Sequence, residues 1–561
     1  MVEADETVTV FRARRVLTMA PPAPTAEAVA VRGGRIIGVG SLDEMAAHGP
    51  HTVDDRFADA VLLPGFVEAH CHVMAGALWN FTYVGYFDRT DPDGRVWEGC
   101  RDTASVVDRL ADAAHAMDTD PDVGPGDPLI AWGLDPIYLE GDRLDADDLD
   151  GASDHRPIFV FHASAHLATV NTAMLEVSGI DAGTAVPGVS RRADGSPDGE
   201  LQEPAAMSLA RLGFSTLVGA MRGPEPIRTL GRLANRAGVT TFADLGTTRP
   251  DTEEGLRSWI DAVEDPVFPA RAVVAGSLMG GSGSPEDRAR LTAELVTHDT
   301  AKLRFGLVKI VLDGSIQGLT ARVGFPGYHN GAPNGLWLIP PEQMPELVGA
   351  FHRAGLTVHC HCNGDEAVDV FLDAVEQALE DHPRYDHRHT VQHCQLTTES
   401  QYRRMAALGM CANIFSNHIY YWGDQHAAIT VGPTRAARMD ACATAARLGV
   451  PFAVHTDAPI TPLSPLASVW SAVTRTTASG RVLGPGERIS VDRALRAVTI
   501  DAAFQLNLDD EVGSIEVGKY ADFAVLAGDP HEVDPADLGS IPVLATVLGG
   551  RVFAVPDGAG G

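Results

Sequence analysis

Apolar and polar positions alternate along both ends of the chain, which is the pattern of half-buried strands. Runs of β-branched and aromatic residues are separated there by turn-forming proline and glycine. The runs occupy 8–19 and 26–40 near the N-terminus, and 513–528 and 543–555 near the C-terminus. We therefore expect a small β-sandwich domain that residues 1–63 and 510–561 build together.

The middle of the chain, 64–509, alternates short apolar strands with helical patterns, which is typical of βα units around a parallel sheet. Between 364 and 380, for example, apolar residues recur at helical spacing. The expected strands occupy 61–72, 238–245, 305–314, 356–363, 389–394, 410–416 and 451–457. The pattern predicts the α/β class, with a (β/α)8 TIM barrel.

The spacing of these strands predicts a large insertion after the first barrel strand. From His72 to the strand at 238 there are about 165 residues, far more than one crossover connection needs. The inserted segment, about 76–225, contains strand-like runs of its own at 128–134 and 156–164. Because the active sites of such barrels lie at the carboxyl ends of the strands, we expect the insertion to cover the site.

Composition and charge narrow the function. The chain has 561 residues, and 75 acidic against 43 basic residues give a net charge of −32. A nucleic-acid partner is not expected, because phosphate binding needs a positive surface. No stretch approaches the about 18 apolar residues of a membrane span, and the N-terminus lacks the features of a secretory signal. We expect a cytoplasmic protein with a small-molecule substrate and no membrane partner.

The first candidate site residues are His70 and His72, at the end of an apolar strand. Side chains alternate along a strand, so both imidazoles point to the same side. Two imidazoles that converge at a strand end make half of a zinc site. The alternative is a chance pair of histidines.

Three further strand ends carry imidazole or carboxylate groups. His361 and His393 each close a strand, and Asp457 ends another. These groups are ordinary ligands for zinc, iron and manganese. Four strand ends of this kind indicate a metal centre at one rim of the barrel. Neighbouring histidines are expected to support the ligands or the core, namely His359, His389 and His455.

The seven cysteines are expected to be free, because an odd number in a cytoplasmic chain argues against a disulfide framework. Cys71, Cys360 and Cys362 alternate with histidines and therefore face away from the candidate ligands. We expect them to pack as small apolar residues between the sheet and the helices, and not to bind zinc.

Lys309 is a further candidate. Only Lys302, Lys309 and Lys519 are lysine among the 43 basic residues, so a position that keeps lysine is unusual in this chain. A primary amine can react with CO2, and the resulting carbamate is an anion able to bridge two metal ions. A salt bridge inside the barrel is the alternative. The position of Lys309 between the first and the later histidine strands favours the carbamate.

The order of these residues resembles the binuclear amidohydrolase superfamily, in which barrel strands one, four, five, six and eight supply the ligands. The strand at 410–416 would then fill the seventh place. The runs at 28–40 and 513–526 are similar to the small β-sandwich of that family. The resemblance implies six metal ligands, which are His70, His72, Lys309, His361, His393 and Asp457.

Longer motifs resemble the YtcJ-like branch of this superfamily, which contains N-substituted formamide deformylase. They lie at 308–321, 359–369, 388–395 and 455–466, with further similarity at 162–171 and 198–205 in the insertion. By this similarity His166, Asn171 and Glu203 are expected near the substrate. Gln392 stands where glutamate is more usual, and 417–426 differs from the commoner pattern, which leaves the substrate open.

The resemblance implies a hydrolase of non-peptide carbon–nitrogen bonds, with an amide or an N-substituted formamide as substrate. Two divalent metal ions are expected, with zinc preferred and iron or manganese compatible. His70, His72 and Asp457 would hold one ion and His361 and His393 the other, with carboxylated Lys309 between them. A metal-bridging hydroxide would attack the carbonyl. Asp457 would take the proton and return it to the departing amine.

Other functions remain compatible with the sequence. A one-metal deaminase also uses a His-x-His pair, a later histidine and an aspartate, but it leaves Lys309 and His393 without roles. The same ligands would serve the hydrolysis of a cyclic amide or an ester. A non-catalytic assembly or regulatory protein would be expected to have lost ligands, and none is missing. The family further predicts a homo-oligomer, most simply a dimer.

Overall fold

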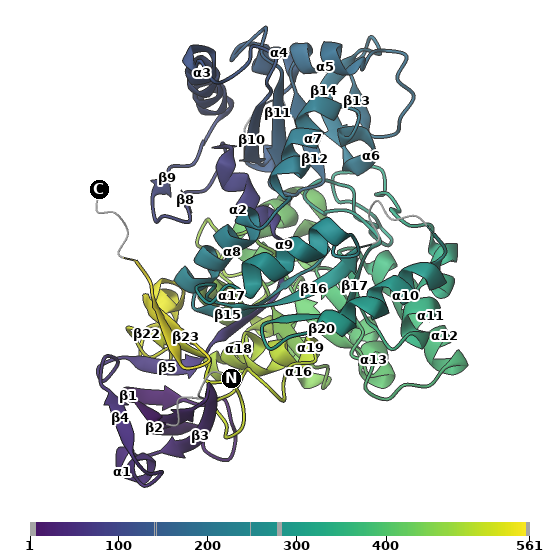
Figure 1. The fold of residues 1–561 in the computed structure, drawn as a ribbon. Coiled ribbons are helices and arrows are strands. Elements are labelled where there is room, and N and C mark those ends of the chain that lie inside the picture. The colour runs from purple at the N-terminus through teal and green to yellow at the C-terminus, as the bar shows by residue number, and fades with distance from the viewer. Residues whose placement is uncertain (1–6, 140, 142, 247, 278–282, 557–561) are drawn as a thin grey trace.

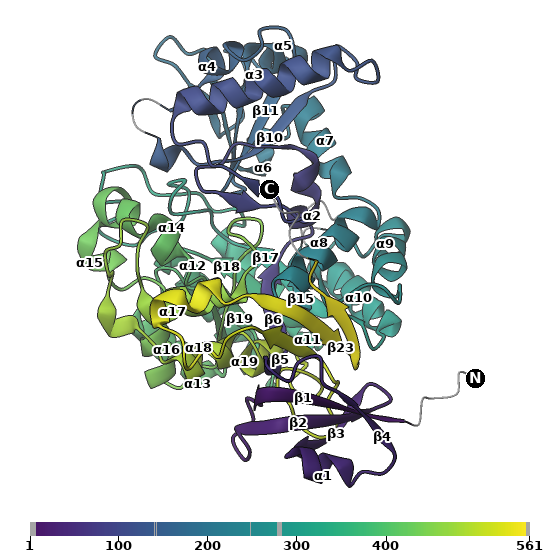
Figure 2. The same ribbon diagram turned by 90° about the vertical axis from the view of Figure 1, so that its left-hand side faces the viewer.

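The computed structural model describes residues 7–139, 141, 143–246, 248–277 and 283–556. Figures 1 and 2 show three parts. A barrel lies in the middle, the inserted segment lies at one end of it, and a sheet from both ends of the chain lies at the other end. No helix in these ranges is both long and apolar enough to cross a bilayer.

Eight parallel strands form the barrel, in the order β21-β20-β19-β18-β17-β16-β15-β6. The sheet closes where Ala458, beyond the last strand, forms a parallel bridge with Cys71 at the end of the first. The predicted α/β TIM-like barrel is therefore confirmed. The strands are β6 (Phe66–Cys71), β15 (Val239–Asp244), β16 (Arg271–Ser277), β17 (Leu303–Val311), β18 (Thr357–Cys362), β19 (Thr390–His393), β20 (Cys411–Ile414) and β21 (Phe452–Val454).

Helices cover the outer face of these strands, because parallel strands are buried on both faces. The helix expected between 364 and 380 is α12 (Asp365–Asp381), and it buries Val368, Phe371 and Val375 against the sheet. The other helices around the barrel include α8 (Glu225–Arg236), α9 (Glu253–Val263), α10 (Pro285–Leu295), α11 (Met344–Arg353), α13 (Glu399–Leu408), α16 (Cys442–Arg447), α17 (Pro465–Thr474) and α18 (Val491–Ala497).

All seven cysteines are free and buried, as predicted. Cys71, Cys360 and Cys362 belong to the large apolar cluster between the strands and the helices. The alternation argument that turned them away from the histidines is therefore confirmed.

The sheet at the opposite end combines strands from both ends of the chain, in the order β24-β23-β22-β5-β1-β2-β3, with β4 beside β1. These described strands form one sheet, so the predicted β-sandwich is not confirmed. The proposed boundaries at 63 and 510 stay a prediction. The strands are β1 (Val8–Leu17), β2 (Thr25–Arg32), β3 (Arg35–Gly40), β4 (His51–Asp54), β5 (Val61–Pro64), β22 (Phe523–Leu526), β23 (Val543–Leu548) and β24 (Arg551–Ala554).

The single strand expected at 61–72 is in fact two strands in different sheets. β5 belongs to the sheet built from both chain ends, whereas β6 opens the barrel. The chain changes sheet at Gly65, where an added Cβ would lie 1.9 Å from Oγ1 of Thr240. Only glycine allows this close approach. The prediction also missed β16, whose apolar run at 272–275 is short.

The insertion is a mixed α/β unit around a six-stranded sheet, in the order β13-β14-β12-β11-β10-β7. Two apolar clusters pack its elements together. Its strands are β7 (Thr82–Tyr83), β10 (Leu129–Leu134), β11 (Ile158–His162), β12 (Leu167–Val170), β13 (Val189–Arg191) and β14 (Pro197–Gln202). Its helices are α3 (Thr103–Thr119), α4 (Ala146–Asp150), α5 (Thr172–Ser178), α6 (Glu203–Met207) and α7 (Arg211–Ala220).

A buried ion pair joins the barrel to the sheet from both chain ends. Arg271 of β16 donates two hydrogen bonds to Asp522, at 2.7 and 3.0 Å. Both side chains are almost fully buried. We expect Arg271→Leu to lower the free energy of unfolding by about 3 kcal/mol, because it leaves a buried carboxylate unpaired.

The thermal unfolding midpoint measures this effect. Arg271→Leu combined with Asp522→Asn should recover part of the loss, since the second change removes the unpaired charge. The exposed pair of Arg257 and Glu253 provides the control, and Arg257→Leu should barely move the midpoint. An unchanged midpoint in Arg271→Leu would show that the pair does not stabilise this junction.

Candidate metal site

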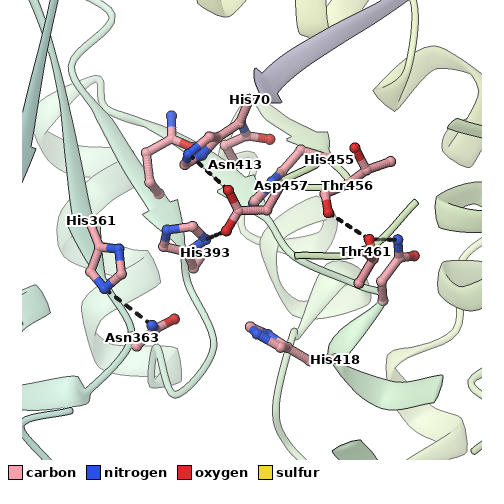
Figure 3. Close-up of polar contacts among 12 residues, drawn as sticks. His70, His361, Asn363, His393, Asn413, His418, His455, Thr456, Asp457 and Thr461 are labelled. Carbon is pink, nitrogen blue, oxygen red and sulfur yellow. Dashed lines mark hydrogen bonds and ion pairs between the residues drawn. The ribbon is translucent and has the colours of Figure 1, made fainter. Parts of the chain in front are cut away.

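Candidate ligands meet where the end of β6 pairs with the segment after β21. Oδ1 of Asp457 lies 3.3 Å from Nε2 of His70 and 3.1 Å from Nε2 of His72. Main-chain hydrogen bonds fix this arrangement, because Asp457 N–H donates to the His70 carbonyl at 3.1 Å and His72 N–H donates to the Ala458 carbonyl at 2.9 Å. Figure 3 shows Asp457 between His70 and His393.

His393 approaches the same carboxylate from β19, with Nδ1 3.7 Å from Oδ2 of Asp457. Both residues have left-handed backbones, with φ of 72° for His393 and 52° for Asp457. This conformation is strained for residues with a Cβ, and such strain is concentrated at functional sites. The neighbouring histidines hold the pKa of Asp457 well below its usual range in spite of burial.

Among the residues that the structure describes, there are two groups of three potential ligand atoms in which all atoms lie within 4.8 Å of one another. One group is His70, His72 and Asp457, and the other is His70, His393 and His455. His455 was expected to have a supporting role, yet its ring stacks on His70 with a centroid distance of 4.7 Å. It is therefore a possible ligand that the sequence pattern did not single out.

His361 lies beside these groups but belongs to neither of them. Its ring centroid is 4.5 Å from that of His393. Its Nε2 faces away from Asp457, at 3.2 Å from both the Gly314 carbonyl oxygen and Nδ2 of Asn363 (Figure 3). A ligand role for His361 therefore requires a change in its contacts.

Lys309 reaches the group from β17. Its Nζ donates to Nε2 of His70 at 2.9 Å. The side chain is buried, and burial lowers the pKa of Lys309 to about 8. A lysine with a lowered pKa has a larger neutral fraction near neutral pH, and the neutral amine is the form that reacts with CO2.

Gln392 sets the orientation of His70. Its Oε1 accepts hydrogen bonds from Nδ1 of His70 at 2.7 Å and from Nδ2 of Asn413 at 3.0 Å, while its Nε2 donates to Nδ1 of His359 at 2.6 Å. Because a carbonyl oxygen only accepts, Nδ1 of His70 carries the hydrogen. The lone pair of His70 Nε2 is therefore directed at Lys309 and Asp457, as a metal ligand requires.

Glu68 is a supporting residue that the sequence reasoning missed. It lies two positions before His70, and its carboxyl group accepts from the main-chain N–H groups of His70 and Thr456 and from the Thr456 hydroxyl. Burial raises the pKa of Glu68 to about 8. A charged residue inside an apolar strand was the available signal.

The insertion brings two of its predicted substrate residues to the barrel. Nδ1 of His166 and Oε2 of Glu203 are 2.8 Å apart, and the His166 ring lies 5.5 Å from that of His361. Glu203 has a φ of 63° at the start of α6. An added Cβ at Gly314 would lie 2.8 Å from Oε1 of Glu203, so the two chain segments are in close contact.

The structure does not bring Asn171, the third predicted substrate residue, to this group. Its Oδ1 accepts from the N–H groups of Ile158 and Met174, and its Nδ2 donates to the carbonyls of Ser153 and Arg156. All four partners lie inside the insertion, where Asn171 caps the N-terminus of α5. Its side chain thus has no hydrogen-bonding capacity left for a substrate.

An aromatic cluster adjoins the histidines. The Phe415 ring stacks on His455 with a centroid distance of 4.8 Å, and Phe415 packs with Trp422 and Ile460. Tyr138 of the insertion joins this cluster. Trp422 also donates to Asp135 of the insertion at 2.6 Å. The barrel and the insertion therefore share an apolar surface next to the candidate ligands.

The donor set fits a divalent transition metal. Both ring nitrogens of His393 and of His455 are buried without a hydrogen-bond partner among the described residues. Burying polar atoms without partners costs free energy, so several such atoms facing one another indicate a site for a cation. Neutral imidazoles and a carboxylate suit zinc, iron and manganese.

Comparisons with known proteins agree with this fold. The chain is 27% identical to Protein LONG AFTER FAR-RED 3 of Arabidopsis thaliana, over 94% of this chain and 88% of that protein. It is 26% identical to N-substituted formamide deformylase of Arthrobacter pascens, over 94% of each chain. The crystal structure of a metal-dependent hydrolase from Pyrococcus horikoshii OT3 has the same fold, with a TM-score of 0.69 and 19% identity over 94% of this chain and 99% of that one.

A family match extends over most of the molecule. Residues 58–554, which include the barrel, the insertion and the C-terminal strands, match the amidohydrolase family. The resemblance to the branch that contains N-substituted formamide deformylase is thereby confirmed. The chain belongs to the amidohydrolase family and is a metal-dependent hydrolase that acts on carbon–nitrogen bonds.

Proposed function

We propose that the protein hydrolyses an amide or an N-substituted formamide with the help of two divalent metal ions, zinc being the expected metal. The observation that carries this proposal is the convergence of His70, His72, His393 and Asp457 with Lys309 at the closed rim of the barrel. The similarity to N-substituted formamide deformylase supports the choice of bond.

The ligands divide between the two ions. His70, His72 and Asp457 would hold the first ion, and His361 and His393 the second. Lys309, carboxylated on Nζ, would contribute an anionic oxygen to each. Its burial and its lowered pKa favour the neutral amine that carboxylation needs. When bound, the ions would polarise the substrate carbonyl and lower the pKa of the attacking water.

Asp457 moves the proton in this scheme. The carboxylate is ionised at neutral pH, so it would accept a proton from the attacking water. It then returns that proton to the departing amine nitrogen. The short contacts of Oδ1 to His70 and His72 keep the carboxylate at the reacting centre.

The insertion supplies the other wall of the substrate site. His166 and Glu203 form a polar pair beside His361, which suits a contact with the acyl end of the substrate. The cluster of Phe415 and Trp422 offers an apolar surface for the substituent on nitrogen. The dimeric state, the cytoplasmic location and the absence of a nucleic-acid partner stay predictions.

Metal content and activity test the proposal together. Protein purified without chelator is expected to contain about two metal ions per chain and to hydrolyse members of a panel of amides and N-substituted formamides. Lys309→Ala should lose the second ion and reduce kcat by at least about 100-fold. Intact mass under gentle conditions should show one added CO2 in the wild type only.

Lys302 is the matched control for Lys309. Burial also lowers the pKa of Lys302 to about 8, but its amine donates to the main-chain carbonyls of Asp265 and Phe268. Lys302→Ala should therefore keep both ions, the added CO2 and the activity. One ion per chain with full activity in Lys309→Ala would contradict the bridging lysine and favour a one-metal site.

Gln392 provides a second prediction, on metal affinity. Gln392→Leu removes the acceptor that holds His70 Nδ1, and the affinity for metal should fall about 10- to 100-fold. Gln392→Glu keeps an acceptor at this position, so it should bind metal at least as tightly as the wild type. Titration against a chelating indicator measures both. Equal affinity in all three proteins would show that Gln392 does not orient the ligand.

A further inference from the structure

Asp440 is a buried carboxylate that the proposed scheme leaves without a role. It lies before α16, has no exposed surface and has a strained φ of 49°. Neither carboxylate oxygen has a hydrogen-bond partner among the described residues. Its ion-pair contact is with His418, whose Nδ1 lies 3.5 Å from Oδ1 of Asp440.

His418 is held firmly at the edge of the candidate metal site. It is the first residue of α14 (His418–Gln425), and its ring lies 4.1 Å from the ring of Phe415 and 5.4 Å from that of Trp422. These aromatic contacts fix the plane of the imidazole. Figure 3 shows the ring pointing toward the space that His361, His393 and Asp457 surround.

The positive charge of the buried Arg475 guanidinium favours the ionised form of Asp440. Arg475 is fully buried, and its guanidinium donates to the main-chain carbonyls of Leu483, Asp440 and Met439. Burial raises the pKa of Asp440 well above its usual range, and the positive charge of Arg475 opposes this rise. A guanidinium keeps its proton, and Asp440 is the main anion that stabilises this one. The two charges balance if Asp440 is a carboxylate and His418 is neutral.

This arrangement selects one tautomer of His418. Nδ1 of His418 and Oδ1 of Asp440 lie 3.5 Å apart, and neither atom has a hydrogen-bond partner among the described residues. A carboxylate only accepts hydrogen bonds, so an ionised Asp440 would place the hydrogen of the neutral ring on Nδ1. The other nitrogen, Nε2, then presents a lone pair to the site. A carboxylate that orients a histidine in this way is a familiar device for fixing a tautomer.

We propose that Nε2 of His418 accepts a hydrogen bond from the N–H of the substrate, and that Asp440 positions it to do so. The inference rests on the proposed amide hydrolysis and narrows its substrate class. An amide or formamide whose nitrogen carries a hydrogen can donate to this lone pair. An ester or an N,N-disubstituted amide has no hydrogen to give and leaves a buried acceptor unpaired.

The tautomer is tested without any substrate. In protein labelled with ¹⁵N-histidine, the His418 signal is identified by its loss in His418→Gln. The wild type should show a protonated Nδ1 and a bare Nε2, and Asp440→Asn should change this pattern. A protonated Nε2 in the wild type, or the same pattern in Asp440→Asn, would overturn the role given to Asp440.

Substrate selectivity tests the contact itself. The probe is a pair of formamides with the same apolar substituent, one with N–H and one N-methylated. The wild type should favour the N–H compound in kcat/KM by about tenfold or more. His418→Phe should abolish most of this preference, whereas His418→Gln, which can still present an oxygen near the position of Nε2, should keep part of it.

A second aspartate–histidine pair, in which only the aspartate is buried, provides the control. Oδ1 of Asp529 lies 3.2 Å from Nδ1 of His531, near the C-terminal strands and away from the barrel site. Asp440→Asn should lower the preference for the N–H compound, and Asp529→Asn should leave it unchanged.

The same preference in His418→Phe as in the wild type would refute the contact while leaving amide hydrolysis intact. No turnover of any amide or formamide would contradict the proposed function itself, and the tautomer measurement would still decide the role of Asp440.

Discussion

Two main-chain hydrogen bonds between the first and the last barrel segments hold the candidate site together. They link Asp457 N–H to the His70 carbonyl and His72 N–H to the Ala458 carbonyl. Without them the carboxylate from the end of the barrel would not face the histidines from its beginning. Glu68 reinforces the same junction, because it accepts hydrogen bonds from both segments. The geometry of the candidate ligands is thus a consequence of barrel closure, and the strained backbone of Asp457 is stabilised by it.

The sequence predicted the parts of this site that depend on local pattern. Alternation along a strand was sufficient to pair His70 with His72 and to turn Cys71 away, and strand ends were sufficient to gather His393 and Asp457 at one rim. The prediction from sequence was less reliable where a residue has a structural role within its own segment, such as capping a helix. Asn171 stands directly before the helix α5, where an asparagine caps the main-chain N–H groups, and this local signal was stronger than the similarity that suggested substrate contact.

The remaining contacts join segments that are far apart in the sequence, and no local pattern reveals them. Gln392 reaches His70 across the barrel, and Asp440 reaches His418 from a different loop. The change of sheet at Gly65 depends on the packing of Thr240 against it, so the run at 61–72 looked like one strand. The length of the chain between the first two barrel strands was sufficient to locate the insertion. It did not predict the close contact between Glu203 of the insertion and Gly314 of the barrel.

The amide at Gln392 has a consequence for the charge of the whole site. A glutamate there would add a buried negative charge beside His70, whereas the amide orients the ring without adding any. Glu68 contributes little charge near neutral pH, because burial raises its pKa to about 8. Among the side chains that contact the candidate ligands, Asp457 and Asp313, whose Oδ1 lies 3.7 Å from Nε2 of His361, are then the carboxyl groups available to offset the two divalent cations that we propose. An unmodified, protonated Lys309 would add to the positive charge, so a neutral Gln392 makes an anionic, carboxylated Lys309 more necessary for binding two metal ions in this chain.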